Sequence, residues 1–362
     1  MKMQFGKEGR RFFFLTFCVR GREPLLSRIV ANNDRGAAPP EPPAAAAGVR
    51  GCNPRSLSAT TALLPPGEAV AALWRGVHAA EPCLTASDFV VMPDHVHLLL
   101  IANYAKNPAF DILNWLHHFM RACEDAIAPL VGRKPSLVWE DRFWLLLVNA
   151  GVSLAAVRRY IRMNPTRKLW KDAHPDMFVR HADLRHRFLD PALPWSAIGN
   201  LTLLASPFLL PVILTRKMTV EQHEPEIERI VAAARHGMIP VSGFLSPGEK
   251  RVQELLRKEE GVRWIKTVPY YLPPRFDPSV EDSRVLAEGR MLVLSSFPPG
   301  VPQSPINWDN CHIMNDRNRA LAARASQDND RGAAPPEPPA TAGVRGCSPR
   351  SLSSTNHLEK QP

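Results

Sequence analysis

Residues 90–100 read Val-Val-Met-Pro-Asp-His-Val-His-Leu-Leu-Leu, and this stretch decides the fold of the first half of the chain. Apolar and β-branched residues on both sides of the Met-Pro-Asp segment predict two strands, Leu84–Val91 and His95–Ile101, joined by a turn. Successive side chains along a strand point to opposite faces, so His95 and His97 share one face and lie about 6–7 Å apart. Two imidazoles on one face can converge on a divalent ion; the plainer interpretation is a pair of surface histidines on a half-exposed strand.

The segments around this hairpin predict an α+β domain. Their apolar spacing gives, in chain order, a strand, a helix, the two strands of the hairpin, a helix, a strand and a helix. This β-α-β-β-α-β-α order is that of a ferredoxin-like, split βαβ sheet with its helices on one face. The segments outside the hairpin are Phe12–Arg20, Pro66–Ala80, Asp111–Ile127, Phe143–Val148 and Ser153–Met163.

Residues 200–325 alternate strands and helices differently. This alternation predicts a parallel sheet covered by helices on both faces, which is a Rossmann-like α/β layout. The expected strands are Leu209–Leu214, Met238–Phe244, Trp264–Val268 and Met291–Ser295, and the expected helices are Thr219–Arg235, Lys250–Glu259 and Asp309–Ala325.

A Pro-, Ala- and Arg-rich repeat occurs twice, at Asn33–Thr60 and again at Asn329–Thr355. Neither copy has aromatic residues or apolar periodicity, so we expect both to be disordered. Near-identity without a hydrophobic pattern is typical of one mobile DNA repeat translated twice; the alternative is a pair of matched linkers or partner-binding segments. The expected divisions are a first domain at 1–198 with a disordered insert at about 32–65, a second domain at 199–326, and a disordered tail at 327–362.

The composition favours a nucleic-acid partner. The 362 residues carry a formal net charge of +10, and a basic excess of this size suits a polyanion. The six cysteines include no C-x-x-C pair, which argues against a disulfide scaffold or a zinc ribbon and fits a reducing compartment. The N-terminal apolar run breaks at Arg20 without a cleavage site, and the stretch at 201–214 is shorter than the ~20 residues of a membrane span. We expect a soluble, cytoplasmic protein.

A second cluster of polar residues follows the hairpin. Tyr160 and Asn164 are four residues apart on a helix that we expect to end before Pro165, so they share a face. A tyrosine hydroxyl is a poor nucleophile unless it is activated or its target is polarised, and a metal held by His95 and His97 would polarise a phosphodiester. The Asn164 amide oxygen is a candidate third ligand, although the plainer interpretation of Tyr160 is a half-buried helical aromatic. The basic residues expected to hold a DNA backbone are Arg158, Arg159, Arg162, Arg167 and Lys168.

Three motifs in this order resemble a known family. MPDHVHLLL at 92–100, WEDRFW at 139–144 and YIRMNP at 160–165 are similar to the motifs of the REP-associated tyrosine transposases, which are single-strand DNA transposases of the HUH-endonuclease type. The resemblance covers roughly Arg10–Pro194, interrupted by the repeat, and implies a ferredoxin-like sheet.

The resemblance also implies an activity. His95 and His97 would bind Mg²⁺ or Mn²⁺ with Asn164 as a helper ligand, and Tyr160 would attack a DNA phosphate, leaving a 5′-phosphotyrosine link and a free 3′-OH. The partner would be single-stranded or hairpin DNA, bound by a monomer or a homodimer. The alternative is a catalytically decayed DNA-binding protein of the same ancestry, silenced by its insert.

The second block resembles the Rossmann-like domain of DNA-processing protein A. The likeness rests on SGFLSPGEKRVQELL at 242–256, Glu288–Gly300 and Asn315–Ser326. In that fold a Gly-containing turn places backbone N–H groups around a phosphate, and a nucleotide-sensing module is one interpretation. The phosphate candidates are Ser242, Gly243, Ser246 and Gly248, with Arg317 and Arg319 as basic partners. The alternative is an accessory domain that grips DNA through Lys250, Arg251, Lys258 and Arg263.

The remaining polar and aromatic groups have plainer interpretations. His117 and His118 fit surface or packing positions, and the pair Glu140-Asp141 fits a solvated site better than a metal site. The aromatic residues Trp139, Phe143 and Trp144 fit the core better than a platform for stacking DNA bases.

Overall fold

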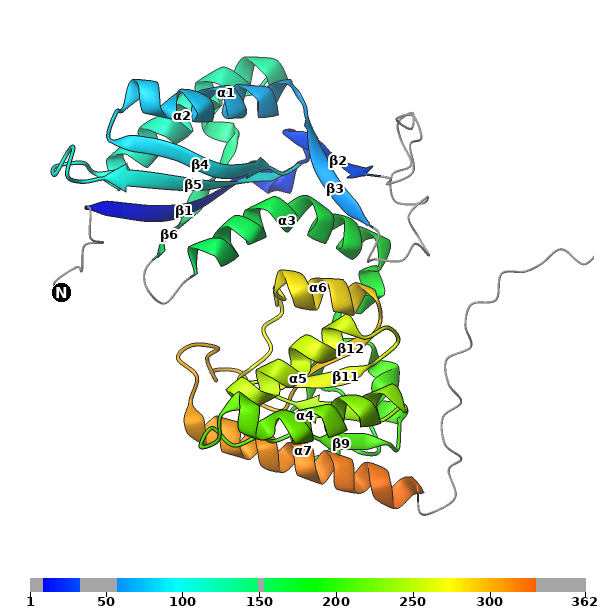
Figure 1. Ribbon diagram of the computed structural model, residues 1–362. Helices are drawn as coiled ribbons and strands as arrows, with labels where there is room; N and C mark the ends of the chain where they lie inside the picture. The colour runs from blue at the N-terminus through cyan, green and yellow to red at the C-terminus, as the bar shows by residue number, and fades with distance from the viewer. Residues whose placement is uncertain (1–8, 33–56, 149–152, 330–362) are drawn as a thin grey trace, which may run out of the picture.

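The computed structural model describes residues 9–32, 57–148 and 153–329, which form two sheet-centred bodies on opposite sides of a long helix (Figure 1). This helix, α3 (Leu154–Ala173), is capped at its N-terminus by Ser153, whose side chain accepts a hydrogen bond from the Ala156 N–H. The other described helices lie in one body or the other. No helix within the described ranges is long and apolar enough to cross a membrane.

The first body is a four-stranded antiparallel sheet in the order β4-β5-β1-β6. Strands β1 and β4 run in the same direction with β5 between them. Helices α1 and α2 cover one face, where Leu15, Leu98 and Trp74 are almost completely buried. The bounds are β1 Arg10–Val19, α1 Pro65–Ala80, β4 Leu84–Val91, β5 His95–Asn103, α2 Ile112–Val131 and β6 Trp139–Val148.

The opposite face of this sheet lies against α3. Val90, Leu99 and Val148 of the sheet pack with Val157 and Ile161 of the helix. Because side chains alternate along β5, the residues at 95, 97 and 99 belong to this face, whereas those at 96, 98 and 100 enter the core under α1 and α2. The alternation in residues 90–100 therefore points the histidine pair toward the α3 side of the sheet.

Helix α3 is longer than its sequence predicts. The expected end before Pro165 is wrong, because the helix continues through that residue to Ala173. A proline inside a helix costs roughly 3 kcal/mol. The last turns bury Leu169 and Trp170, and burial of a large apolar side chain contributes about 1.5–3 kcal/mol each. Tertiary burial therefore outweighs the local preference to stop.

The end of the first repeat copy is ordered, so the expected limits of the disordered insert, 32–65, are wrong at one side. Strand β2 (Ser27–Asn32) pairs antiparallel with β3 (Ser58–Leu63). Leu57 and Ala59 are buried beside α3, and the Ala59 N–H donates to the Thr166 hydroxyl at 3.0 Å. The pairing of β3 with β2 and the burial of Leu57 and Ala59 stabilise this segment, although its sequence has no apolar periodicity. Residues 33–56 of the insert and 330–362 of the tail lie outside the described ranges, and α7 extends to Asn329, beyond the expected start of the tail.

The second body is a six-stranded sheet in the order β7-β8-β12-β11-β10-β9. Strands β9 to β12 are parallel, and β8 and β7 add an antiparallel edge that the sequence did not predict. Helices α4, α5 and α6 cover one face, whereas α7 and a segment at 184–205 cover the other. The bounds are β7 Arg180–His181, β8 Ser196–Gly199, β9 Leu209–Pro211, α4 Val220–Arg235, β10 Ile239–Ser242, α5 Pro247–Lys258, β11 Trp264–Val268, α6 Val280–Ala287, β12 Met291–Ser295 and α7 Trp308–Asn329. The second sheet thus takes strands from before the expected boundary at 198/199.

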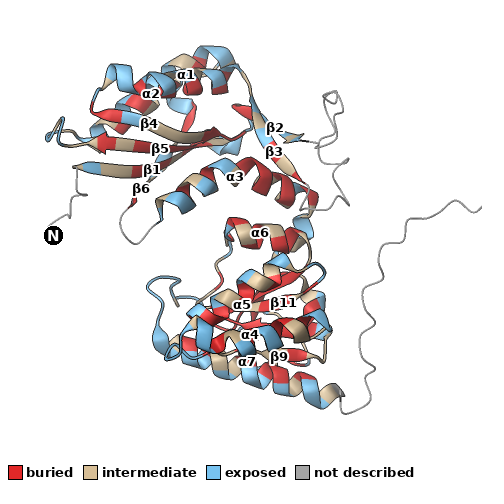
Figure 2. Cartoon of the chain, viewed as in Figure 1, coloured by how far each residue is buried: buried red, intermediate tan, exposed pale blue. Residues whose placement is uncertain are grey.

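The two bodies meet where α6 packs on α3. Leu169 and Trp170 of α3 form one buried cluster with Val280 and Ala287 of α6. Figure 2 shows the second half of α3 and much of α6 in the colour of buried residues. The contact places the loop before α6 next to the middle of α3, where Tyr160 lies.

Candidate active site

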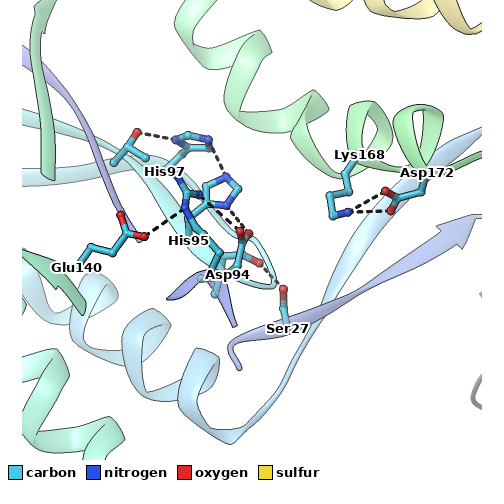
Figure 3. Close-up of polar contacts among 10 residues, drawn as sticks. Ser27, Asp94, His95, His97, Glu140, Lys168 and Asp172 are labelled. Carbon is cyan, nitrogen blue, oxygen red and sulfur yellow. Dashed lines mark hydrogen bonds and ion pairs between the residues drawn. The ribbon is translucent and has the colours of Figure 1, made fainter. Parts of the chain in front are cut away.

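The two histidines at the start of β5 face each other. His95 Nε2 and His97 Nε2 are 3.2 Å apart, and the rings meet edge to face with centroids 4.7 Å apart (Figure 3). His97 is 5% exposed, whereas His95 is half-buried. The structure therefore brings the two predicted ligands together at their Nε2 atoms.

The other ring nitrogens are held by neighbouring side chains. His95 Nδ1–H donates to Asp94 Oδ1 at 2.7 Å, and His97 Nδ1 lies 2.7 Å from the Thr16 hydroxyl, which can donate or accept. Thr16 is directly opposite His97 on β1, so the sheet register sets this contact. Burial and then the charges of His95 and Arg167 lower the pKa of His97 well below its ordinary value, which keeps that imidazole neutral.

The histidine pair fits two ligands of one ion. Imidazole–metal bonds of about 2.0–2.1 Å can bridge two nitrogens 3.2 Å apart, and a carboxylate on the outer nitrogen is a usual support for a ligating histidine. Within the described ranges, no group of three or more His, Cys, Asp or Glu side chains is placed to hold a metal ion. Asn164, the predicted third ligand, is buried and donates its Nδ2–H to the Tyr160 carbonyl at 3.1 Å.

Helix α3 brings Tyr160 to the histidines. The Tyr160 ring lies edge to face with His97 at 5.3 Å between centroids and with Phe14 at 5.9 Å. The Arg167 guanidinium lies over the ring, 4.7 Å from its centroid. The Tyr160 hydroxyl donates to Asp277 Oδ2 of the second body at 3.3 Å. Burial and then the charge of Asp277 raise the pKa of this hydroxyl above its ordinary value, so it is a protonated phenol at neutral pH.

Each of the five cations expected to hold DNA is paired with a carboxylate. The pairs are Arg158 and Arg162 with Asp88, Arg159 with Glu281, Arg167 with Asp277, and Lys168 with Asp172. Figure 3 shows the last of these along α3. The Arg167 side chain is 3% exposed, whereas those of Arg162 and Arg159 are 68% and 60% exposed. The five cations therefore pair with four different carboxylates, and they differ widely in exposure.

Strand β6 carries an exposed aromatic residue that the sequence assigned to the core. Trp144 is 65% exposed, whereas Trp139 on the same strand is 1% exposed. The register pairs Trp144 with Thr16, and Thr16 with His97, so all three lie in one row across the sheet and share a face. Two features of the sequence could have indicated that Trp144 is exposed. It belongs to the WEDRFW motif, and it is an odd number of residues from Trp139, so the alternation along a strand puts the two side chains on opposite faces.

The other residues singled out on this domain are at the surface. His117 and His118 are exposed on α2. Glu140 and Asp141 form ion pairs with Arg22 and Arg20, so they serve as partners of surface arginines.

The predicted phosphate turn of the second body is already filled by a carboxylate. Glu249 is 5% exposed and accepts the N–H groups of Leu214, Leu245 and Ser246 at 2.8–3.3 Å. A Cβ on Gly243 would lie 2.3 Å from Met314 Cε, and one on Gly248 would lie 3.0 Å from the His223 ring, so packing explains these glycines.

Three of the predicted basic residues of the second body have protein partners. Arg317 donates to the Ser296 carbonyl at 3.0 Å, Arg319 pairs with Asp316, and Arg251 pairs with Glu254. Lys250 lines a cavity of about 420 Å³ together with Arg257 and Lys266, both of which pair with buried Asp282. Lys258 is exposed and Arg263 is half-buried.

No protein-family model matches the chain, and no curated protein matches it. Several solved structures show weak similarity, including the following three. A candidate transposase from Deinococcus radiodurans R1 is 17% identical with a TM-score of 0.26, over 44% of this chain and 95% of that one. DNA processing protein A from Helicobacter pylori is 20% identical with a TM-score of 0.32, over 40% of this chain and 67% of that one. A REP-associated tyrosine transposase bound to a REP hairpin is 13% identical with a TM-score of 0.24, over 48% of this chain and 70% of that one. At these values the comparisons assign the chain to no family.

Proposed function

We propose that this chain is a metal-dependent transposase or endonuclease that cuts and rejoins single-stranded DNA through a 5′-phosphotyrosine link. One observation carries the proposal: the Nε2 atoms of His95 and His97 lie 3.2 Å apart, and the Tyr160 ring lies against His97. These residues come from distant segments and are the types that the motif resemblance to the REP-associated tyrosine transposases names. The sheet order supports a ferredoxin-like split βαβ assignment for the first body, and the four parallel strands support a Rossmann-like assignment for the second.

The side chains divide the work of transesterification. His95, fixed by Asp94, and the neutral His97 would hold Mg²⁺ or Mn²⁺, which when bound polarises a phosphate. The Tyr160 oxygen forms a bond to phosphorus and the bond from phosphorus to the 3′ oxygen breaks. The phenolic proton ends on that oxygen, which leaves a 5′-phosphotyrosine and a free 3′-OH. The covalent link keeps the phosphodiester energy for rejoining.

The test is a covalent-adduct assay on a denaturing gel. Purified full-length chain is incubated with labelled, hairpin-bearing single-stranded DNA from the genomic copies of its own repeat and Mn²⁺ or Mg²⁺. We expect a metal-dependent protein–DNA adduct that Tyr160→Phe abolishes while DNA binding on a native gel is kept. Tyr104→Phe is the matched control, because the Tyr104 ring contacts Phe110 and Arg11, neither of which belongs to the site. An adduct that persists in Tyr160→Phe would contradict the assignment of the nucleophile.

The second candidate function is DNA binding without cleavage. The observation that favours it is the hydrogen bond from the Tyr160 hydroxyl to Asp277, because a tyrosine held this way is protonated and directed at a carboxylate. Retention of DNA on a native gel with no adduct, for wild type and for a variant without the Asp277 charge, would favour this alternative.

A further inference from the structure

One carboxylate of the second body accepts hydrogen bonds from three side chains of α3. Asp277 accepts hydrogen bonds from the Tyr160 hydroxyl at 3.3 Å, from Arg167 Nη2 at 2.6 Å and from Lys171 Nζ at 3.0 Å. It lies in the loop between β11 and α6, two residues before Ser279, the N-cap of α6. A carboxylate of the second body thus fills a polar cluster on α3, the helix that packs against the sheet of the first body.

The donors around Asp277 have the chemistry of a phosphate site. A guanidinium, an ammonium and a hydroxyl that point at one anion bind phosphate oxygens as they bind a carboxylate. The Arg167 side chain is 3% exposed, and an anionic partner offsets part of the cost of burying its charge. The cluster therefore favours an anion, and Asp277 supplies it in this structure.

The Asp277 carboxylate can move away from its three donors while α3 and α6 stay packed together. The Asp277 side chain is 48% exposed, so solvent reaches one side of it. Arg167 also donates to the Pro278 carbonyl at 2.8 Å and to the Ser283 hydroxyl at 3.4 Å, and these bonds do not involve the carboxylate. The buried cluster of Leu169, Trp170, Val280 and Ala287 also holds α3 against α6 independently.

We propose that Tyr160, Arg167 and Lys171 form a binding site for a DNA phosphate, and that Asp277 occupies this site until DNA displaces it. The proposal rests on the proposed role of Tyr160 as nucleophile. It makes the second body an inhibitor of the first: with Asp277 in place, the Tyr160 hydroxyl is hydrogen-bonded to the carboxylate and the two cations are paired with it. The bound phosphate takes over both cations and the contact with the tyrosine oxygen.

The experiment compares Asp277→Asn with Asp172→Asn in the full-length chain. Both variants remove one negative charge near α3, but Asp172 pairs with Lys168 of its own helix and not with a group of the proposed phosphate site. We expect Asp277→Asn to bind single-stranded DNA roughly tenfold more tightly than Asp172→Asn, as the loss of a competing charged hydrogen bond implies. The gain should disappear with an oligonucleotide that carries a neutral methylphosphonate at the scissile position.

Equal affinity of the two variants, or a gain that survives the methylphosphonate, would overturn the proposal. If Asp277→Asn does not fold, as judged by its melting temperature, Asp277→Ser is used with the same criteria. The binding measurement does not depend on cleavage. A gain in binding without an adduct from any variant supports the phosphate site and contradicts the proposed function, whereas an adduct with no gain in binding does the reverse.

Discussion

Glu249 and Asp277 are carboxylates that lie where the sequence led us to expect a phosphate, and they differ in burial and in partners. Glu249 is 5% exposed and accepts three backbone N–H groups, of Leu214, Leu245 and Ser246, within its own domain. The Asp277 side chain is 48% exposed and accepts hydrogen bonds from three side chains of α3, which lies outside the second body. A carboxylate that satisfies buried backbone groups is part of the fold, whereas the proposed exchange with phosphate needs a carboxylate that is partly exposed and pairs with side chains, as Asp277 does.

The largest expected effect is the difference in stability that is lost when each of these two carboxylates is removed. Glu249→Ala leaves three N–H groups without their acceptor, so we expect the free energy of unfolding to fall by about 3–5 kcal/mol. Asp277→Ala should lower it by at most about 2 kcal/mol, because Arg167 keeps two oxygen partners. Urea denaturation followed by tryptophan fluorescence measures both. Equal losses would break the distinction between a structural and an exchangeable anion.

A third carboxylate, Asp94, sharpens the comparison because it fills no phosphate site and instead orients His95. Asp94→Asn should weaken Mn²⁺ binding about 10–100-fold, the usual effect of removing a hydrogen-bonding partner of a histidine ligand. Electron paramagnetic resonance of free Mn²⁺ measures the affinity, and His117→Ala on the exposed face of α2 is the control. Unchanged Mn²⁺ affinity in Asp94→Asn would argue against an ion at this histidine pair.

The two tryptophans of β6 provide the next test. Exposed Trp144 lies in the row of Thr16 and His97, so under the proposed function a DNA base would stack on it beside the scissile phosphate. Trp144→Ala should weaken binding of single-stranded DNA by about 1–3 kcal/mol, and Trp144→Phe should retain most of the affinity. Fluorescence anisotropy with a labelled oligonucleotide measures this. An Ala variant that binds like wild type would leave Trp144 as an exposed edge-strand residue without a DNA role.

The smallest effect concerns pH. Burial alone raises the pKa of Asp277, but the charges of Arg167 and Lys171 hold it below the ordinary value of 3.8. A carboxyl group whose pKa is lower in the folded state stabilises the protein above pH 3.8, and this contribution is lost as the pH falls through the folded-state value. For a half-exposed pair we expect less than about 1 kcal/mol. Melting temperatures of wild type and Asp277→Asn should therefore converge below pH 3.8, and parallel curves would contradict this assignment.

The central hairpin and its histidines were predictable from the sequence because strand alternation is local. The register that places Thr16 beside His97 follows from long-range strand pairing and was not predicted. The meeting of Tyr160 with His97 also depends on long-range packing, and it was expected from the chemistry of these residues and from the motif resemblance. The continuation of α3 through Pro165 depends on burial against another domain, which local preferences do not contain.

The contacts of Glu249 and Asp277 differ in how far the sequence could predict them. Ser246 and Glu249 form a capping box, and the pattern Ser-Pro-Gly-Glu at the start of a helix was a readable signal that the turn supplies its own acceptor. Asp277 is more than one hundred residues from Tyr160 and Arg167 and belongs to no motif. Only the packing of α6 on α3 brings it there, so the sequence alone could not predict the contact.

Peptide mass spectrometry after reaction with DNA tests the central claim most directly. Wild type and Asp277→Asn are incubated with a hairpin-bearing single strand and Mn²⁺, then digested with nuclease and protease. The account predicts a nucleotide attached through phosphate to Tyr160 in both proteins, with a greater yield from Asp277→Asn and no modification of Tyr104. A nucleotide on any other residue, or no adduct from either protein despite tight DNA binding, would contradict it.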